Sequence, residues 1–133
     1  MGHRSTARRI AVQALYQSDL AKIDIKDSIM NIIQQEVFPD KTKCFADSLA
    51  NGVWANLTEI DNLISKSSIK WPIDRLNSVD KNILRLAVYE LKFLASSPKA
   101  VIITEAINLA EKYSSADSAK FINGILGDIG KMC

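Results

Sequence analysis

The chain has 133 residues and a mass of 14.7 kDa, which is enough for one domain with a buried core. Hydrophobic residues make up 47% and charged residues 24% of the sequence, a composition typical of globular proteins rather than of disordered or fibrous ones. The net charge of +2, from 17 basic and 15 acidic residues, excludes a histone-like polycation but is compatible with a local basic patch. The apolar runs are too short to span a membrane, and no signal peptide is recognisable.

Metal and cofactor chemistry find little support in the sequence. The two cysteines, Cys44 and Cys133, lie far apart, and His3 is the single histidine, so we expect neither structural zinc nor another metal. Free thiols are typical of a reducing compartment, and we expect a cytoplasmic protein. The motifs of nucleotide-binding loops, zinc proteases and serine hydrolases are missing. Nothing in the sequence argues for an enzyme or for a bound cofactor.

Apolar residues recur at helical spacing along almost the whole chain, and strand patterns are nearly absent. We predict helices over residues 6–21, over 26–37 with Pro39 ending the helix, and over 41–66 with Asp40 as the cap. The third of these carries the widest apolar stripe. Its predicted core residues are Phe45, Leu49, Val53, Leu57 and Ile60.

Three more helices are predicted after a connector around Trp71 and a turn at residues 73–76. Ser78 is the predicted cap of a helix over 79–95, Ser97 and Pro98 open a helix that runs to Tyr113, and the last helix begins at Ala116. The sequence therefore predicts an all-α fold, a compact bundle of six or seven helices. Because no flexible linker is present, we expect a single domain over residues 1–133, with sub-bundles over about 1–70 and 71–133.

Arginines gather at the start of the chain. The first 18 residues contain Arg4, Arg8 and Arg9 and no acidic residue. Cations at the N-terminus of a helix oppose its dipole, at a cost of about 0.3–1 kcal/mol each, which favours a functional use over a merely solvated helix start. The planar guanidinium group binds phosphate and stacks on bases. We therefore interpret this end of the chain as a candidate nucleic-acid contact.

Two helix faces combine charge with aromatic rings. Arg9, Gln13 and Tyr16 lie on one strip of the first predicted helix, away from its apolar stripe. Such a strip can hold a phosphate and stack on a base, although Tyr16 could equally pack against a neighbouring helix. In the last helix, Phe121 borders the apolar stripe beside Asp117 and Lys120 and is either part of the core rim or a stacking surface.

Three segments resemble the NusB family of bacterial transcription antitermination factors. They are ARRIAVQALYQ (residues 7–17), WPIDRL through VDKNILRLAVYEL (71–91), and INLAEKY followed by DSAKFINGIL (107–126). The segments occur in the family's order and spacing and together span nearly the whole chain. Residues 21–45 show little similarity.

The resemblance implies an all-helical RNA-binding protein that catalyses no reaction. Family members bind the single-stranded boxA element of ribosomal RNA leader transcripts together with a small-subunit ribosomal protein that acts as NusE. The complex joins RNA polymerase with other Nus factors and suppresses premature termination. Family members occur as monomers or homodimers.

The resemblance also assigns roles to individual residues. For protein–partner contact, it points to Asp80 and, more weakly, to Asp74. Together with the strip on the first helix, it gives the predicted RNA-binding residues as Arg4, Arg8, Arg9, Gln13, Tyr16, Asp117, Ser118, Lys120 and Phe121. We expect these residues to form a cationic groove where the first and last helices meet.

The sequence departs from the family where Ser5 and Thr6 interrupt the arginine run, so we expect weaker binding to RNA without the partner. Four phosphate contacts, from Arg4, Arg8, Arg9 and Lys120, would give a slope of log K against log salt of roughly −3. Two alternative functions stay open at this point. One is a helical protein-interaction module without an RNA role, and the other is an RNA-targeting domain related to those of ribosomal RNA cytosine methyltransferases.

Overall fold

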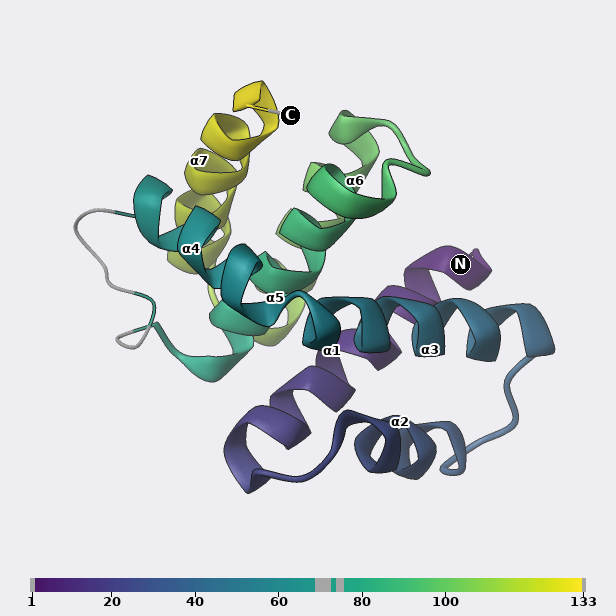
Figure 1. Cartoon of the computed structure of the whole chain (residues 1–133). Coiled ribbons are helices and arrows are strands. Elements are labelled where there is room, and N and C mark those ends of the chain that lie inside the picture. The colour runs from purple at the N-terminus through teal and green to yellow at the C-terminus, as the bar shows by residue number, and fades with distance from the viewer. Residues whose placement is uncertain (1, 69–72, 74–75, 133) are drawn as a thin grey trace.

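The computed structural model describes residues 2–68, 73 and 76–132. Over these residues the chain forms helices and no strand, so the predicted all-α fold is confirmed (Figure 1). The elements in chain order are α1 (His3–Ala21), α2 (Ile25–Ile33), α3 (Asp40–Ala55), α4 (Leu57–Ser67), α5 (Ser78–Tyr89), the π-helical turn η2 (Glu90–Leu94), α6 (Lys99–Tyr113) and α7 (Ala116–Met132). In this part of the chain no helix is both long enough and apolar enough to cross a membrane.

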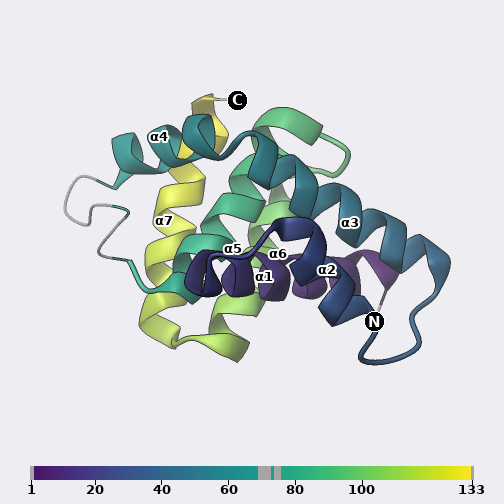
Figure 2. The same cartoon turned by 60° about the horizontal axis from the view of Figure 1, so that its bottom comes forward.

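Helix α5 lies at the centre of the bundle. It contacts α1 and α3 on one side and α4, α6 and α7 on the other (Figures 1 and 2). All residues from 82 to 88 are buried, so this helix has no solvent-facing side over two turns. Each neighbouring helix buries its apolar face against a helix enclosed in this way. Any charged group on the enclosed helix must be paired with a partner inside the protein.

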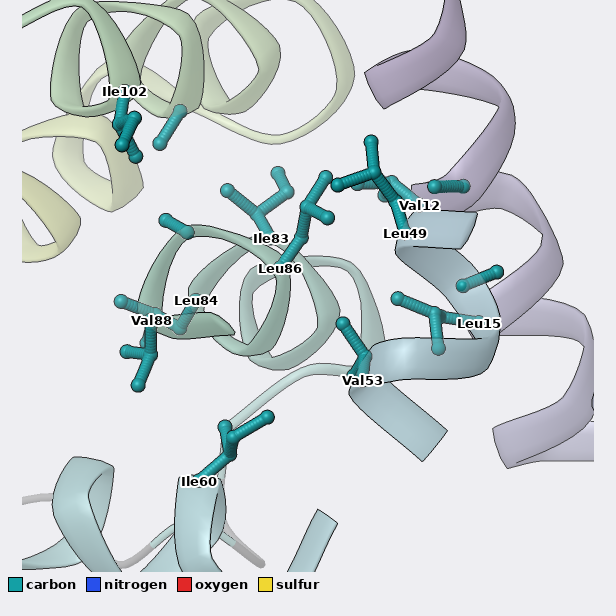
Figure 3. Close-up of a cluster of buried hydrophobic side chains, with 14 of the residues drawn as sticks. Val12, Leu15, Leu49, Val53, Ile60, Ile83, Leu84, Leu86, Val88 and Ile102 are labelled. Carbon is teal, nitrogen blue, oxygen red and sulfur yellow. The ribbon is translucent and has the colours of Figure 1, made fainter. Parts of the chain in front are cut away.

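The core is built where α1 and α3 meet α5. Figure 3 shows Val12 of α1 and Leu49 of α3 close to the α5 side chains Ile83 and Leu86. Of the five core residues predicted in this region, Leu49, Val53 and Ile60 are completely buried. The remaining two, Phe45 and Leu57, are partly exposed and pack against the core from its edge.

The predicted long helix over 41–66 is in fact two helices, because the chain bends at Asn56. This residue has φ −116° and ψ 22°, and its side-chain amide donates a 2.8 Å hydrogen bond to the carbonyl oxygen of Gly52. Its backbone amide bonds to Val53, three residues earlier, while its carbonyl accepts the first hydrogen bond of α4 from Ile60. An asparagine that bonds to its own backbone competes with regular helix, which explains a break without proline.

The bend changes the partners of the following helix. Helices α1, α2 and α3 pack on one another, whereas α4 packs on α5 and α7. The predicted division near Trp71, which itself lies outside the described residues, therefore groups α4 with the wrong helices. We propose that the single domain divides at Asn56 into helices α1–α3 and α4–α7, with α5 joining the two groups.

Several predicted helix ends also differ from the structure. Asn77, not Ser78, caps α5, since its side chain accepts a 2.8 Å hydrogen bond from the Asp80 amide. The predicted helix over 79–95 changes to a π-helical turn at Glu90, closed by a hydrogen bond from the Ala95 amide to the Glu90 carbonyl. Pro39 and Pro98 occupy the positions just before α3 and α6, where their missing amide hydrogens cost nothing.

A partly buried polar network ties the end of α1 to α5. Asp19 accepts a 2.7 Å hydrogen bond from the Ser78 hydroxyl, and the Lys81 ammonium lies 3.0 Å from the same carboxylate. Arg85 lies 3.5 Å from Asp19 and forms two 2.9 Å hydrogen bonds with Asp61 of α4. Burial alone would raise the pKa of Asp19, but the hydrogen bonds from Ser78 and Lys81 and the nearby positive charges lower it below its ordinary value.

Asp19→Asn should therefore destabilise the protein most at neutral pH. Because the pKa of Asp19 is lower in the folded state, its carboxylate stabilises the fold above the unfolded-state pKa, and this contribution disappears as the pH falls through the folded-state pKa. We expect a loss of about 1–3 kcal/mol at pH 7 and a smaller difference from the wild type near pH 3. Urea unfolding at the two pH values measures this, and an equal loss at both would contradict the assignment.

At Gly52 of α3 the packing leaves no room for a side chain. A Cβ atom at this position would collide with the ring of Tyr89, which stacks on Phe93 with 5.9 Å between the ring centroids. Gly52→Ala should destabilise the fold by about 1–3 kcal/mol through overpacking. Gly127→Ala in α7 is the matched control, because a Cβ there has nothing within 4 Å. The control should gain up to about 1 kcal/mol in the free energy of unfolding from helix propensity. Thermal unfolding measures both variants, and a Gly52→Ala variant as stable as the wild type would contradict the prediction.

Candidate nucleic-acid interface

The structure places Arg8 in the interior rather than on a nucleic-acid surface. Its side chain is 3% exposed and makes two 2.8 Å hydrogen bonds to the Glu90 carboxylate, while Glu105 lies 3.5 Å away. Burial alone would lower the pKa of Arg8, but its hydrogen bonds to Glu90 and the two carboxylates raise it. A phosphate cannot reach a guanidinium that is enclosed and paired, so the predicted RNA contact by Arg8 conflicts with the geometry.

The start of α1 is fixed to the loop before α6 and to α6 itself. Arg4 is exposed, donates a 2.9 Å hydrogen bond to the Ser97 hydroxyl and lies 5.4 Å from the ring centroid of Phe45. The Ser5 hydroxyl donates to the Glu105 carboxylate. Arg4 thus keeps a charge at the surface, but the two carboxylates that hold Arg8 lie close to this end of the helix and reduce its positive field.

Arg9, Gln13 and Tyr16 lie together, as the sequence predicts. They line one side of a pocket of about 450 Å³, which we call the apolar hollow, and Arg9 donates a 3.2 Å hydrogen bond to Gln13. Tyr16 is 39% exposed, so its side chain is not fully buried, although it can still pack in part against a neighbouring helix. Tyr113, at the end of α6, lines the same pocket and is 41% exposed.

A second pocket of about 290 Å³, the polar hollow, adjoins the first. Arg9, Leu109 and Tyr113 line both pockets, so they form the shared wall. Lys112 and Asn108 of α6 line the polar hollow, and the Lys112 ammonium lies 5.4 Å from the ring centroid of Tyr113. The two hollows form one groove along α1 and α6, and residues of α2, of the segment after it and of α5 also line its apolar part. Two tyrosine rings and two cations lie along the groove.

The groove contains a further residue that sequence reasoning missed. Gln17 lines the apolar hollow, and its Oε1 is one of two buried side-chain oxygen or nitrogen atoms in the described structure without a hydrogen-bond partner. The other is Oδ1 of Asp80. Leaving a buried acceptor unpaired costs about 1–3 kcal/mol.

The predicted residues of α7 divide into two kinds. Asp117 and Lys120 are exposed and free to meet a ligand, whereas Phe121 is partly buried and packs against the core. Ser118 is half-buried and donates a 2.7 Å hydrogen bond to the carboxylate of Asp80 in α5. The DSxKF motif therefore presents its charges outward and uses its serine to join α7 to α5.

Asp80, the predicted partner contact, is 6% exposed. Its Oδ2 accepts hydrogen bonds from Ser118 and from the side chain of Asn77, at 2.7 and 3.0 Å. The residue organises the junction of α5 and α7, and only its unpaired Oδ1 remains to be satisfied. Asp74 lies outside the described residues.

The structure does not place α1 against α7, so the predicted groove between the first and last helices is not formed by these two helices. In the described structure α7 packs on α4, α5 and α6, while α1 packs on α2, α3 and α5 (Figure 2). Helix α6 is the partner of α1 in the groove, and α7 continues from its end. Lys112 and Tyr113 line the groove but were not among the predicted residues, although a lysine followed by a tyrosine at the end of a predicted helix was a signal in the sequence.

Without Arg8, three of the four predicted phosphate contacts remain. Arg4, Arg9 and Lys120 would give a slope of log K against log salt of roughly −2 instead of −3.

In the described ranges no three side chains of histidine, cysteine, aspartate or glutamate are grouped closely enough to hold a metal ion.

The fold and the groove define an all-helical protein with a surface suited to nucleic acid. The chain belongs to the NusB family, whose profile matches residues 5–131. It is 42% identical to the transcription antitermination protein NusB of Listeria innocua serovar 6a over 126 residues, which cover 95% of this chain and 94% of that protein. It is 37% identical to NusB of Bdellovibrio bacteriovorus over 129 residues, covering 96% and 95% of the two chains.

Solved structures agree with this assignment. T. maritima NusB superimposes with a TM-score of 0.91 at 39% identity, covering 98% of this chain and 92% of that one. A chain from the crystal structure of antitermination factors NusB and NusE in complex with dsRNA has a TM-score of 0.93 at 30% identity, covering 100% and 99%. The relatives are thus matched over almost their entire length, in both sequence and fold.

Arg8 and Arg9 are adjacent, and the geometry predicts opposite consequences for their loss. Arg8→Gln should destabilise the fold by about 3–5 kcal/mol, because it leaves the Glu90 carboxylate buried without its partner. Arg9→Gln should change stability by less than about 0.5 kcal/mol, since its side chain is partly exposed and bonds to the neutral Gln13. Urea unfolding of the two variants measures the difference, and similar losses for both would contradict the distinction.

Proposed function

We propose that this protein is a transcription antitermination factor that binds a boxA-like RNA element of ribosomal RNA leader transcripts. It does so together with the small-subunit ribosomal protein that acts as NusE, as part of a complex with other Nus factors and RNA polymerase. It serves as an adaptor in the cytoplasm and catalyses no reaction. The observation that carries this proposal is the groove between α1 and α6, in a chain that matches the NusB family over nearly its full length.

The groove suits an unpaired strand better than a duplex. Exposed tyrosine rings, Tyr16 and Tyr113, can stack on base faces, and these faces are accessible only where bases are unpaired. A relative was crystallised with NusE and dsRNA, so double-stranded RNA is the natural comparison. We propose single-stranded RNA as the preferred ligand, with Arg4, Arg9, Gln13, Tyr16, Asp117 and Lys120 at or beside its path.

The protein partner is proposed to dock near the start of α5. Asp80 holds Asn77 and Ser118 in place and retains one buried oxygen without a donor. Because this oxygen is buried, a docking protein would contact the exposed Asn77 beside it rather than the carboxylate itself. The same carboxylate is bonded to the serine of the DSxKF motif, so the proposed partner surface and the α7 end of the RNA surface share one hydrogen-bonded junction.

Fluorescence anisotropy with a labelled boxA-like RNA, a scrambled strand and a duplex of the same sequence tests the proposal. With the ribosomal partner present, the boxA-like single strand should bind at least about tenfold more tightly than the other two, the equivalent of 1.4 kcal/mol. Equal affinity for all three RNAs would refute recognition of sequence and strand.

The double variant Arg4→Ala with Arg9→Ala separates this function from that of a protein-interaction module without an RNA role. We expect it to fold normally, to bind the ribosomal partner as the wild type does, and to bind RNA more weakly at every salt concentration below about 0.2 M. The measurement is a titration of each component separately. Partner binding without RNA binding by either the wild type or the variant would favour the interaction module, whereas RNA binding that the double variant leaves unchanged would place the RNA on another surface.

A further inference from the structure

The two hollows of the groove differ in chemistry, although they share a wall. Val12, Tyr16 and Leu109 give the apolar hollow mainly hydrophobic and aromatic surfaces. The polar hollow is lined by Thr6, Asn108 and Lys112 among others. The polar hollow lies between α1 and α6, whereas Ile32 of α2 and Val79 of α5 also line the apolar hollow. Arg9 and Tyr113 lie where one hollow passes into the other.

The charges around the polar hollow favour an anion. Glu105 also lines it, but this carboxylate accepts a hydrogen bond from Ser5 and lies 3.5 Å from the buried guanidinium of Arg8. Within the described chain neither Arg9 nor Lys112 forms an ion pair; Arg9 bonds to the neutral Gln13, and Lys112 lies over the ring of Tyr113. Arg8, Glu90 and Glu105 together carry one net negative charge, and the two cations Arg9 and Lys112 at the hollow outweigh it.

From this arrangement we infer that the groove holds a single nucleotide of the RNA. The base lies in the apolar hollow between the rings of Tyr16 and Tyr113, and its phosphate lies in the polar hollow between Arg9 and Lys112. The apolar hollow, at about 450 Å³, is within the range of pockets that enclose small ligands. This inference rests on the proposed function, since it presupposes that the protein binds single-stranded RNA.

The inference gives Lys112 and Tyr113 separate tasks. A lysine acts on phosphate as a point charge, so it contributes affinity and salt dependence without regard to sequence. A tyrosine ring that stacks on a base contributes affinity with almost no salt dependence. With Lys112 added to Arg4, Arg9 and Lys120, the expected salt slope of the wild type returns to roughly −3.

Two substitutions with different expected signatures test the assignment, using a labelled boxA-like single strand. Lys112→Gln should weaken binding about fivefold at 0.1 M salt and reduce the magnitude of the salt slope by about 0.7. Tyr113→Leu should weaken binding about fivefold or more and leave the slope unchanged. Both side chains are exposed, and thermal unfolding should show that both variants are folded.

Lys131→Gln is the matched control, because Lys131 is also exposed and lies at the opposite end of α7 from the groove (Figure 1). It should retain both the affinity and the slope of the wild type. Lys112→Arg, which keeps the charge, should restore the slope that Lys112→Gln reduces. This rescue distinguishes a phosphate contact from a lysine that only supports the ring of Tyr113.

The possible outcomes separate the two proposals. If the wild type binds no RNA, with or without the ribosomal partner, the proposed function and this inference both fail. If the wild type binds RNA and both variants behave like Lys131→Gln, only the nucleotide site is refuted. If Lys112→Gln and Tyr113→Leu weaken binding of the ribosomal partner in the absence of RNA while RNA binding is unchanged, the groove is a protein-docking surface instead, and the inference is overturned.

Discussion

The enclosure of α5 is the constraint on which the rest of the structure depends. Five helices pack around it, so it has no solvent face over two turns. Its apolar side chains form the core common to both halves of the bundle, as Figure 3 shows. The charged groups within the helix and just beyond its end must then be satisfied internally, and this requirement decides where the neighbouring helices can lie. Arg85 bonds to Asp61 of α4, and Glu90 bonds to Arg8 of α1.

These internal pairs also explain how arginines are tolerated at the start of a helix. The dipole argument correctly indicates that cations there need a compensating interaction. For Arg8 the compensation is a buried carboxylate that lies 82 positions later in the sequence. For Arg9, one residue further along the helix, the side chain turns toward the groove and finds the neutral Gln13. Two adjacent arginines thus take different positions, one buried against carboxylates and one lining the groove, and only the tertiary packing distinguishes them.

Local patterns were sufficient to predict the helices and the strip of Arg9, Gln13 and Tyr16, because both follow from the 3.6-residue period of a single element. The bend at Asn56 was missed since the apolar stripe continues across it, and only the side-chain bond to Gly52 reveals it. Lys112 and Tyr113 face α1 across the groove, a relation that no pattern within α6 contains. Contacts between helices that are far apart in the sequence therefore could not be predicted from local patterns.

The small net charge of +2 has a consequence for how such an adaptor would discriminate among RNAs. Each phosphate contact adds affinity for every RNA alike, so a densely basic surface would bind ribosomal and messenger transcripts without distinction. Here carboxylates neutralise Arg8 within the fold, and few cations remain for the backbone of the ligand. Under the proposed function, affinity would then come from base contacts in the groove and from a second protein that is held at the same RNA. A weak electrostatic contribution thus makes tight binding conditional on both the right sequence and the right partner, which is the property that a factor controlling termination at selected transcripts requires.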